Sequence, residues 1–171
     1  MAESAGASPA IRELGSCAKV RVVTWGSEFL PGTVAALSSL AGVVALRTGP
    51  SDWLLVSETA HGVAVNGDAI LRVARDALAG DASVRAVDVS QALAAIEIIG
   101  VRARELLEKA CAVDLHPRAF AVGSSTRTRF ANVAAIVLRA GDEEFRCYVA
   151  RSHRDYVLSW LNDAAAEWPG A

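Results

Sequence analysis

The residue types used for nucleophilic, acid–base and metal chemistry occur in this chain, but their spacing does not assemble a reactive site. Ser152, His153 and Asp155 carry the side-chain types of a hydrolase triad. They fall within one predicted helix start, where they cannot line up as nucleophile, base and orienting acid, so capping of the helix is the better interpretation. The histidines are far apart and lack the spacing of metal ligands. The sequence therefore predicts no catalytic and no metal-binding residue.

Two further patterns could bind a phosphate or another small anion. Gly100 lies between a predicted strand and a predicted helix, but the two additional glycines of a dinucleotide-binding loop are missing. Residues 123–129 read GSSTRTR, and the alternation of a strand places Arg127 and Arg129 on one face. A solvated or partner-facing sheet surface is the favoured interpretation, and a small-anion-binding module stays as an alternative.

The composition indicates a protein with much apolar surface and little net charge. Of the 171 residues, 53% are hydrophobic and 21% are charged, and the formal net charge is −2. Much of the apolar excess is alanine, so it reflects either alanine-rich codon usage or surface that is buried against other subunits. No basic block is present, so the composition offers no electrostatic attraction for nucleic acid or anionic lipid.

We expect a soluble, cytoplasmic protein without a membrane segment. The chain begins with Met1-Ala2-Glu3-Ser4, which places an acid where a signal peptide has a base. The longest uncharged apolar stretch, near residues 34–46, is too short to span a bilayer. The cysteines are odd in number and distant in sequence, so we expect buried, reduced thiols at Cys17, Cys111 and Cys147.

The predicted strands and helices indicate an α+β fold with mainly antiparallel sheets and about four packing helices. Strands are predicted near residues 17–25, 43–47, 53–57, 83–89, 94–99, 124–131, 133–139 and 145–149. Helices are predicted near residues 33–40, 70–78, 103–111 and 152–168. Turn residues at 49–52 and 141–142 predict hairpins.

The domain organisation follows from these elements. Residues 1–16 are rich in alanine, serine and glycine, which predicts a flexible N-terminal segment. Residues 17–171 are expected to form a single α+β domain of two similar halves, about 17–90 and 91–171, because each half mixes hairpins with packing helices.

Several motifs from about residue 43 to the C-terminus carry a family resemblance. They are GPSDWLL at 49–55, VDVS at 87–90, GVRAR at 100–104, DLHPRAF at 114–120, VARS at 149–152, Tyr156 and Trp160-Leu161. On these motifs the chain resembles the gamma subunit of heterotetrameric sarcosine oxidases, and DLHPRAF is the most specific of them. The resemblance implies a fold like that of a truncated folate-binding aminomethyltransferase domain.

The same resemblance implies a noncatalytic structural subunit of a flavoenzyme complex. Such a complex oxidatively demethylates sarcosine to glycine, formaldehyde or methylenetetrahydrofolate, and hydrogen peroxide. The gamma subunit has no cofactor of its own, and FAD, FMN, NAD and zinc are implied in the partner alpha, beta and delta subunits.

A minimal folate-dependent one-carbon transferase is the enzymatic alternative. The related aminomethyltransferases have an acidic pair just before a strand, and one of those acids helps the transfer reaction. The matching position here is Asn132-Val133-Ala134, which holds no carboxylate for acid–base help.

Two places are predicted to contact a partner chain. Trp168 lies near the C-terminus, where a large side chain is hard to bury within one small domain. The polar turn with Asp114, His116 and Arg118 is the second, because a guanidinium can make forked hydrogen bonds to a partner carboxylate or carbonyl. The alternative is that this turn only closes a helix end and ties Asp114 to local backbone amides.

Overall fold

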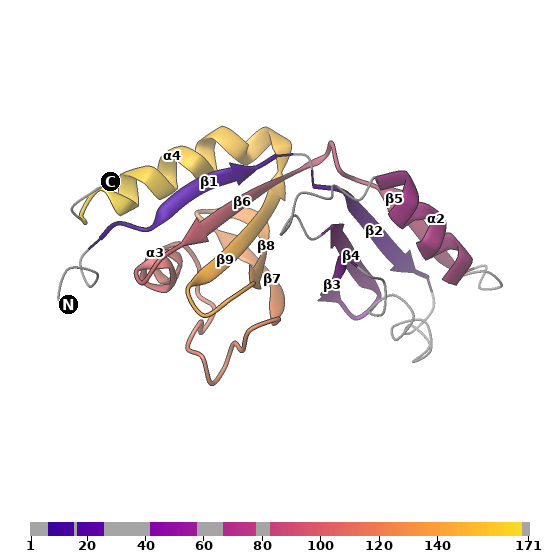
Figure 1. Cartoon of the computed structure of the whole chain (residues 1–171), viewed down its shortest axis with the longest axis horizontal. Coiled ribbons are helices and arrows are strands. Elements are labelled where there is room, and N and C mark those ends of the chain that lie inside the picture. The colour runs from indigo at the N-terminus through magenta and orange to yellow at the C-terminus, as the bar shows by residue number, and fades with distance from the viewer. Residues whose placement is uncertain (1–6, 16, 26–41, 58–66, 78–82, 169–171) are drawn as a thin grey trace. The chain divides into compact units, whose positions relative to one another are not determined.

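The computed structural model describes residues 7–15, 17–25, 42–57, 67–77 and 83–168. It confirms the α+β class, since two antiparallel sheets are accompanied by helices (Figure 1). Three of the four expected helices lie in the described ranges, whereas the helix expected near residues 33–40 lies outside them. None of the helices in the described ranges combines the length and apolar character that a membrane crossing requires.

Contacts divide the chain into two compact units. The N-terminal unit is Gly15–Leu93, and the C-terminal unit combines Met1–Leu14 with Ala94–Ala171. The boundary near residue 93 falls close to the expected division between residues 90 and 91. That the two halves form a single domain stays a prediction.

The N-terminal unit is a four-stranded antiparallel sheet with one described helix. Its elements are β2 (Lys19–Thr24), β3 (Val43–Gly49), β4 (Asp52–Ser57), α2 (Gly67–Ala77) and β5 (Val84–Asp88). The strand order is β3-β4-β2-β5. Ile70 and Ala74 lie one helical turn apart on α2 and pack on Val20, Val22 and Leu55 of the sheet, because apolar residues at this spacing share one helix face.

The C-terminal unit is a five-stranded sheet with two helices. Its elements are β1 (Ala10–Leu14), β6 (Leu93–Ile99), α3 (Ala103–Ala110), β7 (Ser125–Phe130), β8 (Val133–Arg139), β9 (Glu144–Ala150), a 3-10 turn (Arg151–His153) and α4 (Arg154–Ala165). The strand order is β1-β6-β9-β8-β7, with antiparallel pairing of β1 to β6 and of β8 to both β7 and β9. Helix α4 runs alongside β1 in Figure 1.

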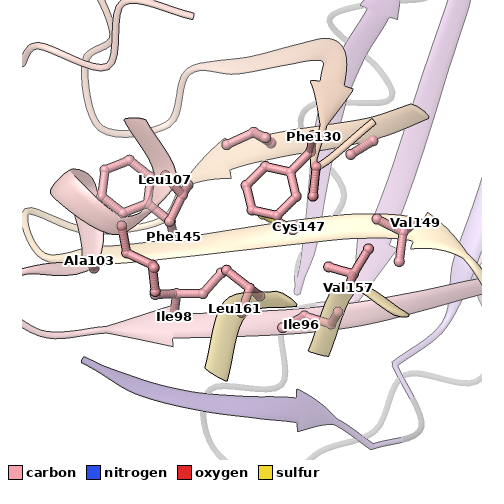
Figure 2. Packing of buried hydrophobic residues seen from close by; sticks show 14 of the residues in the cluster. Ile96, Ile98, Ala103, Leu107, Phe130, Phe145, Cys147, Val149, Val157 and Leu161 are labelled. Atoms are coloured by element: carbon pink, nitrogen blue, oxygen red, sulfur yellow. The ribbon is translucent and has the colours of Figure 1, made fainter. Parts of the chain in front are cut away.

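The core of the C-terminal unit lies between one face of this sheet and its two helices. Figure 2 shows side chains from β6, β9, α3 and α4 meeting there. On α4, Val157, Leu161 and Ala165 are buried at intervals of four residues, so one stripe of the helix faces the core. Phe130 of β7 is fully buried and packs edge-on against the Trp160 ring, with 6.1 Å between centroids.

The expectation that residues 1–16 form a flexible segment is wrong for Ala10–Leu14, which form strand β1. Residues Ala10–Leu14 pair with β6, with Ile11 opposite Ile98 and Arg12 opposite Glu97. The strand is held by residues more than eighty positions away, since Arg12 forms an ion pair with Glu97 and Arg154 of α4 binds Glu13 at 2.6 Å. Composition alone contains no sign of such long-range contacts.

Candidate functional site

The turn at residues 114–120 is organised by its own hydrogen bonds. The backbone N–H of His116 donates to the Asp114 carboxylate at 2.9 Å, and the backbone N–H of Arg118 donates to Nδ1 of His116 at 3.2 Å. The backbone N–H groups of Ala119 and Phe120 both donate to the carbonyl of His116. Aspartate commonly stabilises a turn in this way, by accepting a hydrogen bond from the backbone N–H of the residue two positions later.

Two apolar side chains and a buried arginine anchor this turn to the C-terminal unit. Leu115 and Phe120 are buried in the core cluster. Arg139, at the end of β8, is buried and donates to the carbonyl of Phe120 at 2.9 Å. It also donates to the carbonyls of Gly141 and Asp142 in the β8–β9 hairpin, so one guanidinium ties the turn to that hairpin.

The polar side chains of the turn remain at the surface. Asp114, His116 and Arg118 are exposed, and the Arg118 guanidinium makes no hydrogen bond or ion pair with another described residue. The geometry supports the local role for Asp114. Contact of the turn with a partner stays a prediction, and Arg118 is the side chain best placed to make it.

Trp168 is partly buried by its own unit. Its ring packs against the core cluster, and the ammonium of Lys109 lies 4.1 Å from the ring centroid, a cation–π arrangement. Lys109 also pairs with the carboxylate of Glu167. Among the described hydrogen bonds, ion pairs and ring contacts, none joins Trp168 to Asp114, His116 or Arg118. A contact between Trp168 and another chain stays a prediction.

Two further motifs of the family resemblance have structural roles in the N-terminal unit. The backbone N–H of Ser90 donates to Asp88 at 2.8 Å, and the Ser90 hydroxyl accepts from the backbone N–H of Lys19 at 2.9 Å. These bonds join the end of β5 to the start of β2. In the hairpin at residues 49–52, which is confirmed, Asp52 accepts two hydrogen bonds from Arg21 and thereby raises the pKa of that guanidinium.

Strand β7 carries the arginines that were considered for anion binding. Arg127 and Arg129 are both exposed, whereas Phe130 points into the core. Neither guanidinium makes a hydrogen bond or ion pair with another described residue. The two side chains therefore form a small positive strip on one face of the strand.

Asn132 occupies a tight turn between β7 and β8. Ala131 and Asn132 have φ values of 45° and 69°, as in the hairpin turns that match the twist of adjacent strands. The backbone N–H of Ala131 donates to the carbonyl of Ala110 at the end of α3, which holds the turn in place. The Asn132 side chain is exposed.

Burial affects the thiols of two of the cysteines. Burial raises the pKa of the Cys111 thiol, which donates to the carbonyl of Leu107 at 3.4 Å. Burial also raises the pKa of the fully buried Cys147 thiol. Both thiols therefore stay protonated at neutral pH, whereas a reactive cysteine needs a lowered pKa. All three cysteines are free, and Cys17 and Cys147 are buried.

The segment at residues 151–155 differs from the expected capping motif. A 3-10 turn precedes α4, and His153 occupies the capping position without a side-chain hydrogen bond. Arg151 and Arg154 instead pair with Glu13 of β1, a contact that the local Ser-x-x-Asp spacing cannot indicate. Of the histidines, His61 lies outside the described ranges, and within those ranges no three His, Cys, Asp or Glu side chains gather as metal ligands.

A charge network that the sequence did not indicate crosses β1, β6 and β9, with Glu97 and Arg146 buried and Arg12 exposed. Glu97 accepts from Arg12 at 2.5 Å and from Arg146 at 3.3 Å, and Arg146 also donates to Glu144 at 2.7 Å. Burial alone lowers the pKa of Arg146, but Tyr148, Glu144 and Glu97 outweigh it and raise that pKa. Single charged residues inside otherwise apolar strands, AAIEII and FRCYV, were the available signal.

The fold and this site together define a small α+β chain whose characteristic motifs form anchored turns and hairpins. The sequence profile of the sarcosine oxidase, gamma subunit family matches residues 23–167. The chain belongs to this family.

Individual relatives agree with the family assignment. The gamma subunit of sarcosine oxidase from Corynebacterium sp. (strain U-96) is 29% identical over 143 residues, which are 83% of this chain and 66% of that relative. The chain's match thus spans slightly less than two thirds of the length of this curated relative.

Solved structures place the fold in the same group. A chain of the heterotetrameric sarcosine oxidase from Corynebacterium sp. U-96, in complex with pyrrole 2-carboxylate, superposes with a TM-score of 0.79 and 25% identity, covering 99% of this chain and 91% of that chain. The aminomethyltransferase T of the glycine cleavage system from Bartonella henselae gives a TM-score of 0.61 at 12% identity. This superposition covers 91% of this chain and 46% of the transferase. The expected likeness to a truncated aminomethyltransferase fold is therefore confirmed.

Proposed function

We propose that this chain is a noncatalytic structural gamma subunit of a cytoplasmic heterotetrameric sarcosine oxidase. The complex oxidatively demethylates sarcosine to glycine, formaldehyde or methylenetetrahydrofolate, and hydrogen peroxide. The partner alpha, beta and delta subunits hold FAD, FMN, NAD and zinc. The observation that carries the proposal is the match to the gamma subunit family over residues 23–167.

The geometry supports a role in packing. The Asp114 carboxylate accepts a backbone hydrogen bond within its own turn, and Glu97 is bound by two arginines. Burial keeps the thiols of Cys111 and Cys147 protonated. These groups hold the chain together, and a catalytic acid, base or nucleophile needs a pKa tuned to its reaction and access to substrate.

The experiment is purification of the chain alone, followed by an absorbance spectrum and a titration with tetrahydrofolate. We expect no flavin absorbance and no stoichiometric tetrahydrofolate binding. A bound flavin would overturn the proposal. Tight binding of one tetrahydrofolate per chain would favour the one-carbon transferase, in spite of the amide at Asn132.

A further inference from the structure

Strand β7 is the outermost strand on one side of the five-stranded sheet. In the described part of the chain, β8 is its neighbour on one side, and no strand pairs with its other side. An unpaired strand edge presents backbone N–H and C=O groups that can accept a further strand. The exposed arginines Arg127 and Arg129 lie two residues apart on this edge strand.

The opposite edge of the same sheet shows what is missing at β7. On β1, Arg12 lies opposite Glu97 and forms an ion pair with it. On β7, Arg127 lies opposite Ile136 and Arg129 lies opposite Ala134. The arginine of β1 therefore faces a carboxylate on the neighbouring strand, whereas the two arginines of β7 face apolar side chains.

Most other arginines of the C-terminal unit have an acidic partner within the chain. These are Arg12, Arg102, Arg104, Arg139, Arg146, Arg151 and Arg154. Two adjacent like charges without an acid repel each other, and a carboxylate from outside the chain would relieve this repulsion. Arginine is well suited to that contact because its planar guanidinium makes paired hydrogen bonds to a carboxylate.

We propose that β7 is a docking edge for an acidic, extended segment of a partner subunit. The segment adds beside β7 as a further strand, and carboxylates at alternating positions bind Arg127 and Arg129. Residues two apart on a strand are separated by about 6.6 Å, so an acid-x-acid pattern on the incoming strand has the matching repeat. This inference rests on the proposed role as a subunit of a larger complex.

A second copy of this chain is a poor occupant for the same edge. Pairing of β7 with β7 would bring four guanidinium groups together, and like charges on facing strands are destabilising. A general guard against aggregation is the remaining explanation, because charges on an edge strand discourage non-specific pairing. A guard works with either sign of charge, whereas an acidic partner requires a positive one.

This difference in sign defines the test. The double variant Arg127→Glu/Arg129→Glu and the charge-preserving variant Arg127→Lys/Arg129→Lys are each assembled with the remaining subunits of the oxidase. The matched control is Arg72→Glu/Arg75→Glu on α2, where both arginines are exposed. Affinity for the other subunits is measured at two salt concentrations, and amide hydrogen exchange of β7 is measured in the free chain and in the complex. Thermal unfolding of each free variant verifies that it folds.

We expect the glutamate variant to bind the other subunits about 10-fold more weakly or worse, with reversed salt dependence. The lysine variant and the α2 control are expected to bind nearly as the natural chain does. Amides of residues 125–130 are expected to exchange more slowly in the natural complex.

Equal affinity of the glutamate variant, or unchanged exchange of β7 on assembly, would overturn this inference while leaving the proposed function intact. If the natural chain itself fails to assemble with the oxidase subunits, both the proposed function and this inference are wrong. Self-association of the natural chain that the glutamate variant abolishes would also overturn it.

Discussion

The C-terminal unit holds its charges in two contrasting ways. Glu97, Arg139 and Arg146 are buried, and each is bound by residues distant in the sequence or across a hairpin. Asp114, His116 and Arg118 are exposed, and their described hydrogen bonds stay within four residues. We therefore expect the buried set to determine stability, and we propose that the exposed set, with the arginines of β7, makes contacts outside the chain.

The largest expected effect is at Glu97. Glu97→Gln removes the carboxylate from between Arg12 and Arg146, and Arg146 then stays buried without one of its acids. We expect a loss of about 3 kcal/mol in the free energy of unfolding, measured by urea denaturation, because breaking a buried pair leaves an uncompensated charge. Glu97→Met/Arg146→Met removes both charges and is expected to recover part of that loss. A change in the free energy of unfolding below about 0.5 kcal/mol for Glu97→Gln would show that the buried charges contribute no more to stability than the exposed ones.

Arg139→Met is expected to have the next largest effect. It deletes the donors to the carbonyls of Phe120, Gly141 and Asp142, and charged hydrogen bonds of this kind contribute about 1.5–3 kcal/mol. Amide exchange of residues 114–124 should accelerate more than that of β6. Uniform acceleration over the whole unit would show that Arg139 does not act on the turn in particular.

Lowering the pH is expected to have a smaller effect on stability, through protonation of Glu13. The hydrogen bond from Arg154 lowers the pKa of this carboxyl below its ordinary value despite the opposing effect of burial, and the charges of Arg154 and Arg151 add to the lowering. A lowered folded-state pKa contributes stability that is complete above the unfolded value and is lost as the pH falls through the folded value. Unfolding curves between pH 6 and pH 3, with about 0.5 unit between points, should therefore show a decline in stability that Glu13→Gln reduces. Identical curves would show that the contact between β1 and α4 adds no stability.

The smallest effect on stability is expected at Arg118. Its guanidinium makes no hydrogen bond or ion pair with another described residue, so Arg118→Ala should change the free energy of unfolding by less than about 0.5 kcal/mol. If the turn contacts a partner, the same variant should weaken assembly of the complex, as measured by titration calorimetry. The matched variant Asp114→Ala removes a backbone hydrogen bond and should instead cost about 1 kcal/mol of stability.

The fold was predictable where short-range patterns carry the information. Apolar residues four apart on α2 and α4 indicated the helices, and short apolar segments such as β8 and β9, joined by turn residues, indicated the antiparallel strands. The N-terminal strand was missed because it has five residues in an alanine- and serine-rich segment, and its partners Glu97 and Arg154 are far along the chain.

The site was predictable to a lesser extent. The sequence singled out residues 114–120, and the local role of Asp114 was one of two interpretations left open. It gave no indication that Arg139 would anchor the turn or that Lys109 would cover Trp168, because both contacts join separate elements. Which surface meets a partner depends on chains whose surfaces are not encoded in this sequence.

We propose that this chain contributes packing surface and no reactive group to the oxidase. Sarcosine-dependent oxygen consumption, measured for the purified chain alone and for the complex assembled with its partner subunits, tests it most directly. We expect turnover by the assembled complex and none by the chain alone. Oxygen consumption by the purified chain, in the absence of every other subunit, would contradict it.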